Sequence, residues 1–286
     1  MPELPEVEVV RAGLAKWVTK KTIDQVKVLH PRAIRNHPGS KKDFENQLTG
    51  RKIKSVNRRG KYLWLTLNDD KALVTHLGMS GQVLIKSTKE NDDRHLRVRF
   101  TFVGQKNQMH FVDQRTFGGM HLDELVDIGD GELIPESVLH IARDPFDPKF
   151  SADEFVENVR KRNTDVKRAL LNQTLISGVG NIYADESLWR AKLHWAYPAN
   201  RLTNAKAFEL LGHATDVMRE ALAEGGTSFD ALYVNVNGQS GYFERGLAAY
   251  GREDEPCLRC GRLMVRDSFM NRSSFRCPKC QPKPKG

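Results

Sequence analysis

The sequence predicts an α+β protein built from several domains, and three observations predict it. Short β-rich segments follow one another between Thr22 and Leu122, helical patterns occupy Ser151 to Glu224, and paired cysteines stand near the end. Runs of strands followed by runs of helices are typical of α+β proteins or of separate domains. At 286 residues the chain is long for a single domain, so we expect two or three.

The composition narrows the classes of partner. The net charge is +9 with a pI near 9.4, which favours a polyanionic partner, most commonly nucleic acid, although charge alone does not exclude an ordinary basic protein. No run of 18 apolar residues exists, so we expect no membrane-spanning helix. Charged residues stand where a signal peptide needs an apolar core, so we do not expect secretion. We therefore expect a cytoplasmic protein, associated with the nucleoid when on DNA. Nothing points to an oligomer, and we expect a monomer.

The N-terminal segment predicts a helix from Pro5 to about Val18. Proline is tolerated in a first helical turn, and Val7, Val10 and Leu14 continue one apolar stripe to Val18. This stripe would hold the N-terminus on a folded body.

Pro2 would become the first residue once Met1 is removed, and its secondary amine would then be free. Such an amine can attack an electrophilic carbon and hold it as an iminium, as Schiff-base lysines do. Glu3 beside it offers a general acid or base. The alternative is that Pro2 only begins a frayed tail.

The segment from Thr22 to Leu122 predicts a β-sandwich or a flattened barrel, because many short strands alternate with turn signals. Leu96 to Phe102 alternates apolar and polar residues cleanly, so one of its faces is buried. The predicted strands are Ile23–Leu29, Lys52–Val56, Tyr62–Leu67, Ala72–Leu77, Gln82–Ile85, Leu96–Phe102 and Gln108–Val112.

Three loops of this segment suggest contact with DNA. Met79 and Phe117 stand in glycine-rich turns, from which apolar side chains can wedge between bases. Arg115 can read a base edge. The run Arg58-Arg59-Gly60-Lys61 is a candidate phosphate clamp. Taken singly, each of these residues could instead be structural.

The second half predicts helices over Asp153–Arg162, Val166–Leu171 and Ala205–Ala223, the last ending at Gly225-Gly226. Between them, Gly178-Val179-Gly180 forms a tight turn, and Asn181 would cap a helix running to about Arg190. Phosphate fits the N-terminus of such a helix, although the turn could also be a plain helical corner.

Two Cys-x-x-Cys pairs form the strongest local motif. They are separated by 16 residues, which matches tetrahedral zinc binding by four cysteines rather than a redox role. The intervening Arg266 to Arg276 is long enough for a β-hairpin. We expect one structural zinc ion that holds a cationic hairpin, with the ligands Cys257, Cys260, Cys277 and Cys280.

Together these motifs closely resemble the formamidopyrimidine-DNA glycosylase family, which also contains endonuclease VIII. The resemblance covers nearly the whole chain. The residues that carry it are Pro2-Glu3-Leu4-Pro5-Glu6-Val7-Glu8, Arg59-Gly60-Lys61-Tyr62, His76-Leu77-Gly78-Met79-Ser80-Gly81, Gly178-Val179-Gly180-Asn181-Ile182-Tyr183-Ala184, Asn271-Arg272-Ser273-Ser274-Phe275 and the four cysteines.

The resemblance implies a base-excision-repair enzyme, a bifunctional glycosylase and apurinic/apyrimidinic lyase. Its substrates would be 8-oxoguanine opposite cytosine and formamidopyrimidines in double-stranded DNA, with the damaged nucleotide flipped out. The implied domains are a catalytic β-sandwich with an N-terminal helix (1–132), a linker (133–150), a helix–two-turns–helix domain (151–236), and a loop with a zinc-finger hairpin and tail (237–286).

The resemblance also assigns roles to individual residues. Pro2 would attack C1′, Glu3 would protonate the opening sugar, Lys61 would contact phosphate and assist β-elimination, and Arg272 would clamp phosphates and assist δ-elimination. Residues that would fill the vacated stack or touch DNA elsewhere are Met79, Arg115, Phe117, His95, Arg162, Lys167 and Asn181.

The chain departs from the family pattern in the loop that follows the predicted strand Gln108–Val112. The usual Asp-Pro-Arg-Arg-Phe-Gly is Asp113-Gln114-Arg115-Thr116-Phe117-Gly118 here, which removes a proline and one charge. The usual Leu-Leu-Asp-Gln is Leu171-Asn172-Gln173.

Two rival functions stay open. An endonuclease VIII-like enzyme would act on oxidised pyrimidines, but Leu4 and the long loop over 234–242 favour the purine enzyme. A zinc-dependent DNA-binding protein would form no covalent adduct.

Overall fold

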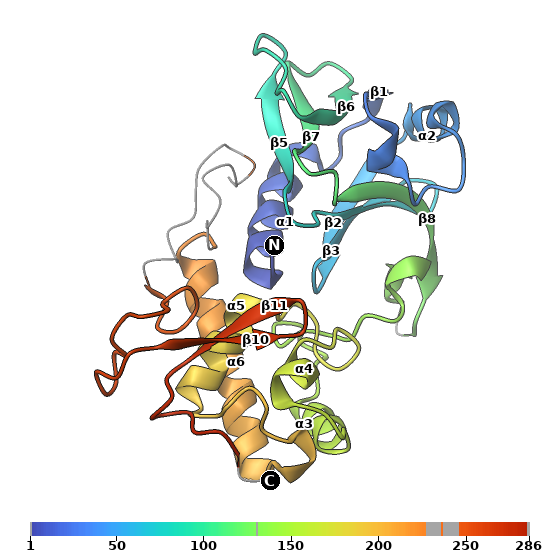
Figure 1. The fold of residues 1–286 in the computed structure, drawn as a ribbon. Coiled ribbons are helices and arrows are strands. Elements are labelled where there is room, and N and C mark those ends of the chain that lie inside the picture. The colour runs from blue at the N-terminus through green and yellow to red at the C-terminus, as the bar shows by residue number, and fades with distance from the viewer. Residues whose placement is uncertain (1, 130, 227–235, 237–245, 285–286) are drawn as a thin grey trace. The chain divides into compact units, whose positions relative to one another are not determined.

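The computed structural model describes residues 2–129, 131–226, 236 and 246–284, and the chain forms two compact units. The first unit comprises 1–140 and 225–242, and the second comprises 141–224 and 243–286 (Figure 1). The loop predicted over 234–242 lies outside the described residues except for Val236. The domain boundaries given above stay predictions.

The first unit begins with helix α1 (Leu4–Val18), as the apolar stripe predicts. Its buried face packs beside two antiparallel sheets. The four-stranded sheet has the order β1 (Ile23–Val28), β6 (Leu96–Phe102), β7 (Asn107–Asp113) and β5 (Gly81–Ser87), and the five-stranded sheet has the order β2 (Ile53–Arg59), β3 (Tyr62–Leu67), β4 (Lys71–His76), β8 (Gly119–Asp127) and β9 (Leu133–Pro135).

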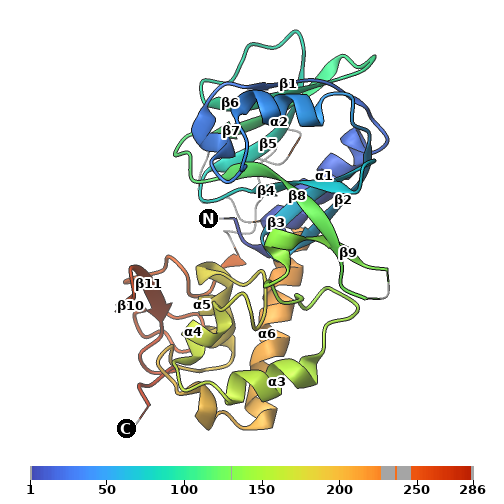
Figure 2. The same ribbon diagram turned by 90° about the vertical axis from the view of Figure 1, so that its right-hand side faces the viewer.

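The core of this unit lies between the two sheets, which Figure 2 shows as separate layers. Val98 and Phe100 of β6 meet Leu65 of β3 and Leu73 of β4 in one buried cluster. Strand β6 alternates buried and half-buried residues along its whole length, as its sequence predicts. The predicted sandwich and the α+β class are confirmed.

Two parts of the first unit differ from the sequence prediction. Helix α2 (Lys41–Leu48) interrupts the strands; Ser40 caps it by accepting the Asp43 N–H, and Phe44 and Leu48 bury its inner face. Strands β8 and β9 occupy a stretch that lacks clear periodicity, and β9 lies within the predicted linker. The short 3-10 helices η1 (Pro31–Ile34) and η2 (Glu136–Val138) flank these elements.

Val236 packs into the core of the first unit. Its side chain is buried in the core cluster, and its carbonyl accepts the Ile85 N–H at 3.0 Å. A Cβ built on Gly13 would lie 2.2 Å from Val236 Cγ2, so helix α1 accommodates this side chain only because it has a glycine there.

The second unit is a helical body that carries a small hairpin (Figure 1). Its helices are α3 (Ala152–Arg160), α4 (Val166–Leu170), α5 (Asn181–Arg190), η3 (Ala199–Arg201) and α6 (Asn204–Ala223). Helix α6 packs on α5 and α3. The hairpin predicted between the cysteine pairs is present as β10 (Val265–Phe269) and β11 (Arg272–Arg276), and β11 packs on α5.

No helix among the described residues is long and apolar enough to cross a membrane.

Candidate functional site

The first residues of the chain are built into the first unit. Pro2 is buried, and Glu3 is only 2% exposed. Glu3 caps helix α1 through a reciprocal capping box, in which its N–H donates to Glu6 Oε2 at 2.8 Å. Gly226, with φ of +91°, lies against the Glu6 side chain. From Pro2 onward the segment is therefore held in place rather than frayed.

Lys61 follows the Gly60 turn between β2 and β3 and is 8% exposed. His76, at the end of β4, contacts Tyr62, with ring centroids 4.8 Å apart and ring planes tilted by 49°. Burial, together with the charges of Lys61 and Arg35, lowers the pKa of His76 to about 4. His76 is therefore neutral at pH 7, and its Nδ1 accepts the Gly78 N–H at 3.1 Å.

Arg58 and Arg59 do not form the predicted three-cation phosphate clamp with Lys61. Both end strand β2 and are largely buried. Arg58 Nε lies 2.9 Å from Glu8 Oε2, and Arg59 Nη2 lies 2.5 Å from Glu132 Oε1. Their charges are balanced inside the unit, and the phosphate contact of Lys61 stays a prediction.

Two loops present the predicted wedge residues, and their backbones touch. A Cβ on Gly78 would lie 2.5 Å from Gly118 N, and Gly78 has φ of +63°. Only glycine fits this approach. Met79 and Phe117 are each 47% exposed, and Arg115, two residues before Phe117, is exposed as well.

Asp113 anchors the second of these loops from within. The residue is fully buried; its Oδ2 accepts the Gly118 N–H at 2.7 Å, and its Oδ1 accepts the Arg115 N–H at 3.2 Å. Ser80 Oγ donates to the same Oδ1 at 2.5 Å, which joins the two loops. His95 lies at the base of the loop, where its carbonyl accepts the Asp113 N–H.

In the second unit, the turn between α4 and α5 is closed by Gln173. Its Nε2 donates to the carbonyls of Leu171 and Val179, and its Oε1 accepts the Gly178 N–H. Gly178 has φ of +90°, a left-handed conformation that favours glycine. The glycine-rich motif is therefore a braced turn that leads into α5.

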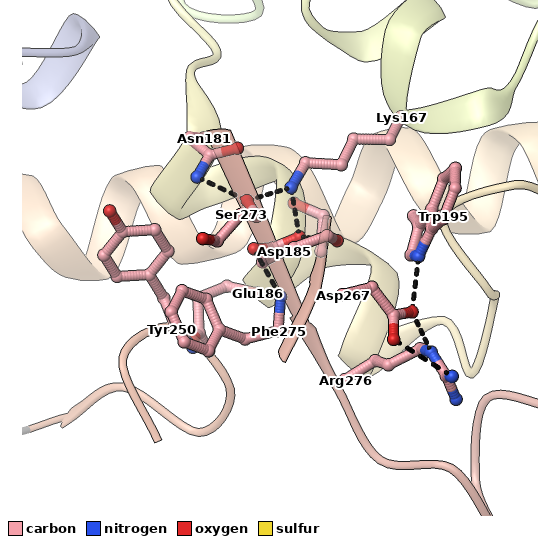
Figure 3. A network of polar contacts seen from close by, with 12 residues as sticks. Lys167, Asn181, Asp185, Glu186, Trp195, Tyr250, Asp267, Ser273, Phe275 and Arg276 are labelled. Atoms are coloured by element: carbon pink, nitrogen blue, oxygen red, sulfur yellow. Dashed lines mark hydrogen bonds and ion pairs between the residues drawn. The ribbon is translucent and has the colours of Figure 1, made fainter. Parts of the chain in front are cut away.

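Asn181 does not cap helix α5 as predicted; Gly180 occupies the cap position and Asn181 is the first helical residue. Its Nδ2 donates instead to the Ser273 carbonyl of β11 at 2.9 Å (Figure 3). The side chain thus reaches the hairpin rather than the end of its own helix.

Lys167 is fully buried and does not lie on the surface where a DNA contact would place it. Its Nζ lies 2.7 Å from Asp185 Oδ1 and donates to the Ser273 carbonyl at 3.2 Å (Figure 3). Asp185 also accepts from Ser274 Oγ at 2.8 Å and from the Phe275 N–H at 3.0 Å. Burial raises the pKa of Asp185, and the charge of Lys167 opposes that rise.

The base of the hairpin has a second anchor. Asp267 on β10 accepts from Trp195 Nε1 at 2.7 Å and from Arg276 Nε at 2.6 Å (Figure 3). Glu186 on α5 accepts three backbone N–H groups from 248–250, at 2.8 to 3.0 Å, in the segment that leads to the cysteines.

The tip of the hairpin carries Arg272, which is exposed beside Met270. Both residues line a cavity of about 700 Å³ in the second unit. Lys161, Arg162 and Arg168 line it as well. The predicted residues Arg162 and Arg272 are therefore brought together, and the cations around this cavity form a candidate phosphate-binding surface.

The four cysteines meet as the sequence predicts. Their Sγ atoms all lie within 4.8 Å of one another, which suits a tetrahedral metal ion with bonds of about 2.3 Å to sulfur. Without an ion the cysteines shift in opposite directions: burial raises the pKa of Cys277 to about 12 and raises that of Cys280, whereas backbone N–H groups outweigh burial and lower the pKa of Cys257 to about 6. The cluster can hold one metal ion with no open position.

Sequence reasoning did not single out Asp185, Glu186, His76 or Arg35 as functional residues. Asp185 and Glu186 follow the glycine-rich motif directly, and acidic residues inside an otherwise apolar helix are the signal that could have identified them. Arg35 offers no local signal, since the loop carbonyls that it contacts lie 81 to 83 residues away.

Family models match most of the chain. The model of the formamidopyrimidine-DNA glycosylase N-terminal domain matches residues 1–120, and that of the formamidopyrimidine-DNA glycosylase H2TH domain matches 141–231.

Individual relatives agree. The formamidopyrimidine-DNA glycosylases of Salinispora arenicola and Rhodococcus jostii are 59% and 58% identical, over all of this chain and 98% and 97% of theirs. A solved Lactococcus lactis FPG mutant with Fapy-dG containing DNA matches with a TM-score of 0.86 at 30% identity, covering 99% of this chain and all of that one. MutM in complex with carbocyclic 8-oxo-G containing DNA matches with a TM-score of 0.85 at 31% identity, with the same coverage. The chain belongs to the formamidopyrimidine-DNA glycosylase family of enzymes.

Proposed function

We propose that this protein removes oxidised purines, chiefly 8-oxoguanine and formamidopyrimidines, from double-stranded DNA and then cleaves the strand at the resulting abasic site. The observation that carries the proposal is the fixed N-terminal segment, in which Pro2 and Glu3 are buried and capped on helix α1. An amine held beside a carboxyl group can attack a sugar carbon without first ordering a flexible tail. The protein would act as a monomer in the cytoplasm.

The first chemical step forms one bond and breaks another. Once Met1 is removed, the Pro2 nitrogen adds to C1′, the bond from C1′ to the base breaks, and the departing base takes up a proton. Glu3 protonates the ring oxygen as the sugar opens, which leaves an iminium between Pro2 and C1′.

Strand cleavage follows by two eliminations. Loss of a C2′ proton expels the 3′ phosphate, and loss of a C4′ proton then expels the 5′ phosphate. Lys61 and Arg272 would bind the phosphates that leave; Lys61 lies in the turn between β2 and β3, and Arg272 is the first residue of β11. Water releases the sugar fragment from Pro2 and regenerates the amine.

The wedge loops and the basic surface would bind the DNA. Met79, Arg115 and Phe117 would fill the space left by the flipped nucleotide, with Arg115 facing the unpaired cytosine. Arg162 and Asn181 would lie near the phosphates together with His95, whereas Lys167 would act through the hairpin. We propose zinc for the four cysteines, where it would hold the hairpin that carries Arg272.

Base release from defined duplexes tests this proposal. We expect release of 8-oxoguanine opposite cytosine to exceed release of thymine glycol from a matched duplex. Preferred release of thymine glycol would instead favour an endonuclease VIII-like enzyme. Binding without release of either base, from protein whose Met1 is shown to be removed, would favour a DNA-binding protein without catalysis.

A further inference from the structure

The loop that presents Arg115 and Phe117 adopts a backbone that its own sequence disfavours. Thr116 has φ of +54°, in the left-handed region, where a β-branched residue is disfavoured by about 1–2 kcal/mol. Gln114 stands where the family pattern has a proline, so the loop also lacks that source of stiffness. Contacts from outside the loop must therefore stabilise this conformation.

Arg35 makes those contacts on the carbonyl side of the loop. Its Nη1 donates to the Gly118 carbonyl at 2.6 Å, and its Nη2 donates to the Phe117 carbonyl at 2.8 Å. A longer contact of 3.4 Å joins Nη1 to the Thr116 carbonyl. One guanidinium thus spans three successive carbonyls, and hydrogen bonds from a charged donor contribute more than neutral ones.

Arg35 itself is fixed by the turn that precedes it. It ends the 3-10 helix η1, whose Ala33 and Ile34 are buried in the core of the first unit. Its backbone N–H and its Nη1 both donate to the Arg32 carbonyl. The guanidinium is therefore held against the loop by a turn packed on the core.

The backbone N–H groups and the backbone carbonyls of the loop are bound by two different residues. Asp113 accepts N–H groups at Arg115 and Gly118, while Arg35 donates to the carbonyls that follow Arg115. We propose that Arg35 is a positioning residue that fixes Arg115 and Phe117 for their place in the DNA stack. This inference rests on the proposed function, because it assigns the loop a role in excision.

Arg35→Met tests the proposal, with Arg32→Met as its matched control. Arg32 lies on the same 3-10 helix, and its guanidinium has no hydrogen bond or ion pair among residues 2–129, 131–226, 236 and 246–284. In R35M, amide hydrogen exchange over residues 114–118 is expected to accelerate at least about tenfold, since the guanidinium no longer donates to the three loop carbonyls. In R32M the exchange rate is expected to equal that of the wild type. Both variants are expected to keep the wild-type melting temperature within a few degrees.

The functional arm measures excision of 8-oxoguanine opposite cytosine and opposite adenine. R35M is expected to lose at least about fivefold of the preference for cytosine, mostly in kcat. Arg35→Lys, which keeps a donor, recovers part of the preference. The dependence of DNA affinity on salt is expected to keep its wild-type slope.

Three results would overturn the inference. Unchanged exchange in the loop of R35M would show that Arg35 does not hold it. Faster exchange with an unchanged preference for cytosine would remove its role in positioning. A uniform loss of affinity with a salt slope smaller by about one would identify a phosphate contact instead. If the wild-type protein releases no 8-oxoguanine, the proposed function fails, while the exchange arm still decides whether Arg35 holds the loop.

Discussion

The ammonium of Lys167 and the carboxylate of Asp185 lie 2.7 Å apart, with side chains 0% and 1% exposed. Lys167 donates to the Ser273 carbonyl of the hairpin, and Asp185 accepts from Ser274 Oγ and from the Phe275 N–H. The pair therefore links helices α4 and α5 to the strand that carries Arg272.

Lys167→Met is expected to destabilise the protein by about 3–5 kcal/mol, because it leaves the Asp185 carboxylate buried without its counter-charge. Urea unfolding measures the loss. The double variant K167M/D185N removes both charges and is expected to recover part of it. Glu220→Gln is the control; it breaks the exposed Arg190–Glu220 pair, whose arginine lies on the same helix α5, and is expected to cost no more than about 1 kcal/mol. Equal losses for the two single variants would contradict this account.

Gly78→Ala is expected to be more damaging than Gly104→Ala. Both glycines have positive φ, +63° and +68°, but a Cβ at Gly78 would overlap the backbone of Phe117 and Gly118 whereas Gly104 faces open space. Because of this overlap, Gly78→Ala should lower the free energy of unfolding by about 1–3 kcal/mol more than Gly104→Ala does, and it should displace Met79. Calorimetry on the two variants gives the comparison, and equal melting temperatures would show that the loops do not need this contact.

His76 is expected to make the protein less stable in acid. Its folded pKa is about 4, below the ordinary 6.5, because of burial and the charges of Lys61 and Arg35. Between these two values the unfolded chain binds more protons, so the free energy of unfolding falls as the pH is lowered, by up to about 1.4 kcal/mol per pH unit from this residue. Unfolding of wild type and His76→Asn between pH 7 and 4.5 tests this. The free energy of unfolding should depend less steeply on pH in the variant than in the wild type. Parallel curves would refute the role of His76.

Removal of the metal is expected to abolish DNA binding. Without an ion the four cysteines no longer hold β10 and β11 together, since structural metal sites supply folding free energy. We expect one zinc per chain by elemental analysis and loss of affinity on chelation, restored by added zinc. Full affinity in protein shown to be metal-free would argue against this structural role.

Features set by short-range periodicity could be predicted from the sequence. The alternation along β6, the apolar stripe of α1 and the paired cysteines each reflect residues within a few positions of one another. Helix α2 has no clear apolar periodicity because it is short and polar, although Ser40 and Asp43 carry a capping signal.

Long-range pairing could not be predicted. Arg58 and Arg59 look like free cations in sequence, but Glu8 and Glu132 neutralise them from elsewhere in the chain. Lys167 resembles a surface DNA contact, yet it is buried against Asp185 and a carbonyl 106 residues later. Charge and motif identify which residues can act, whereas burial decides whether they face the surface or organise the interior.

Borohydride trapping on a duplex containing 8-oxoguanine opposite cytosine tests the central claim most directly. Borohydride reduces an iminium to a stable amine, so the protein would become covalently linked to DNA, and sequencing the linked peptide identifies the attacking nitrogen. We predict an adduct at Pro2, in protein that lacks Met1. Absence of any adduct from protein whose Met1 is removed, and which still binds the duplex, would contradict Pro2 as the nucleophile.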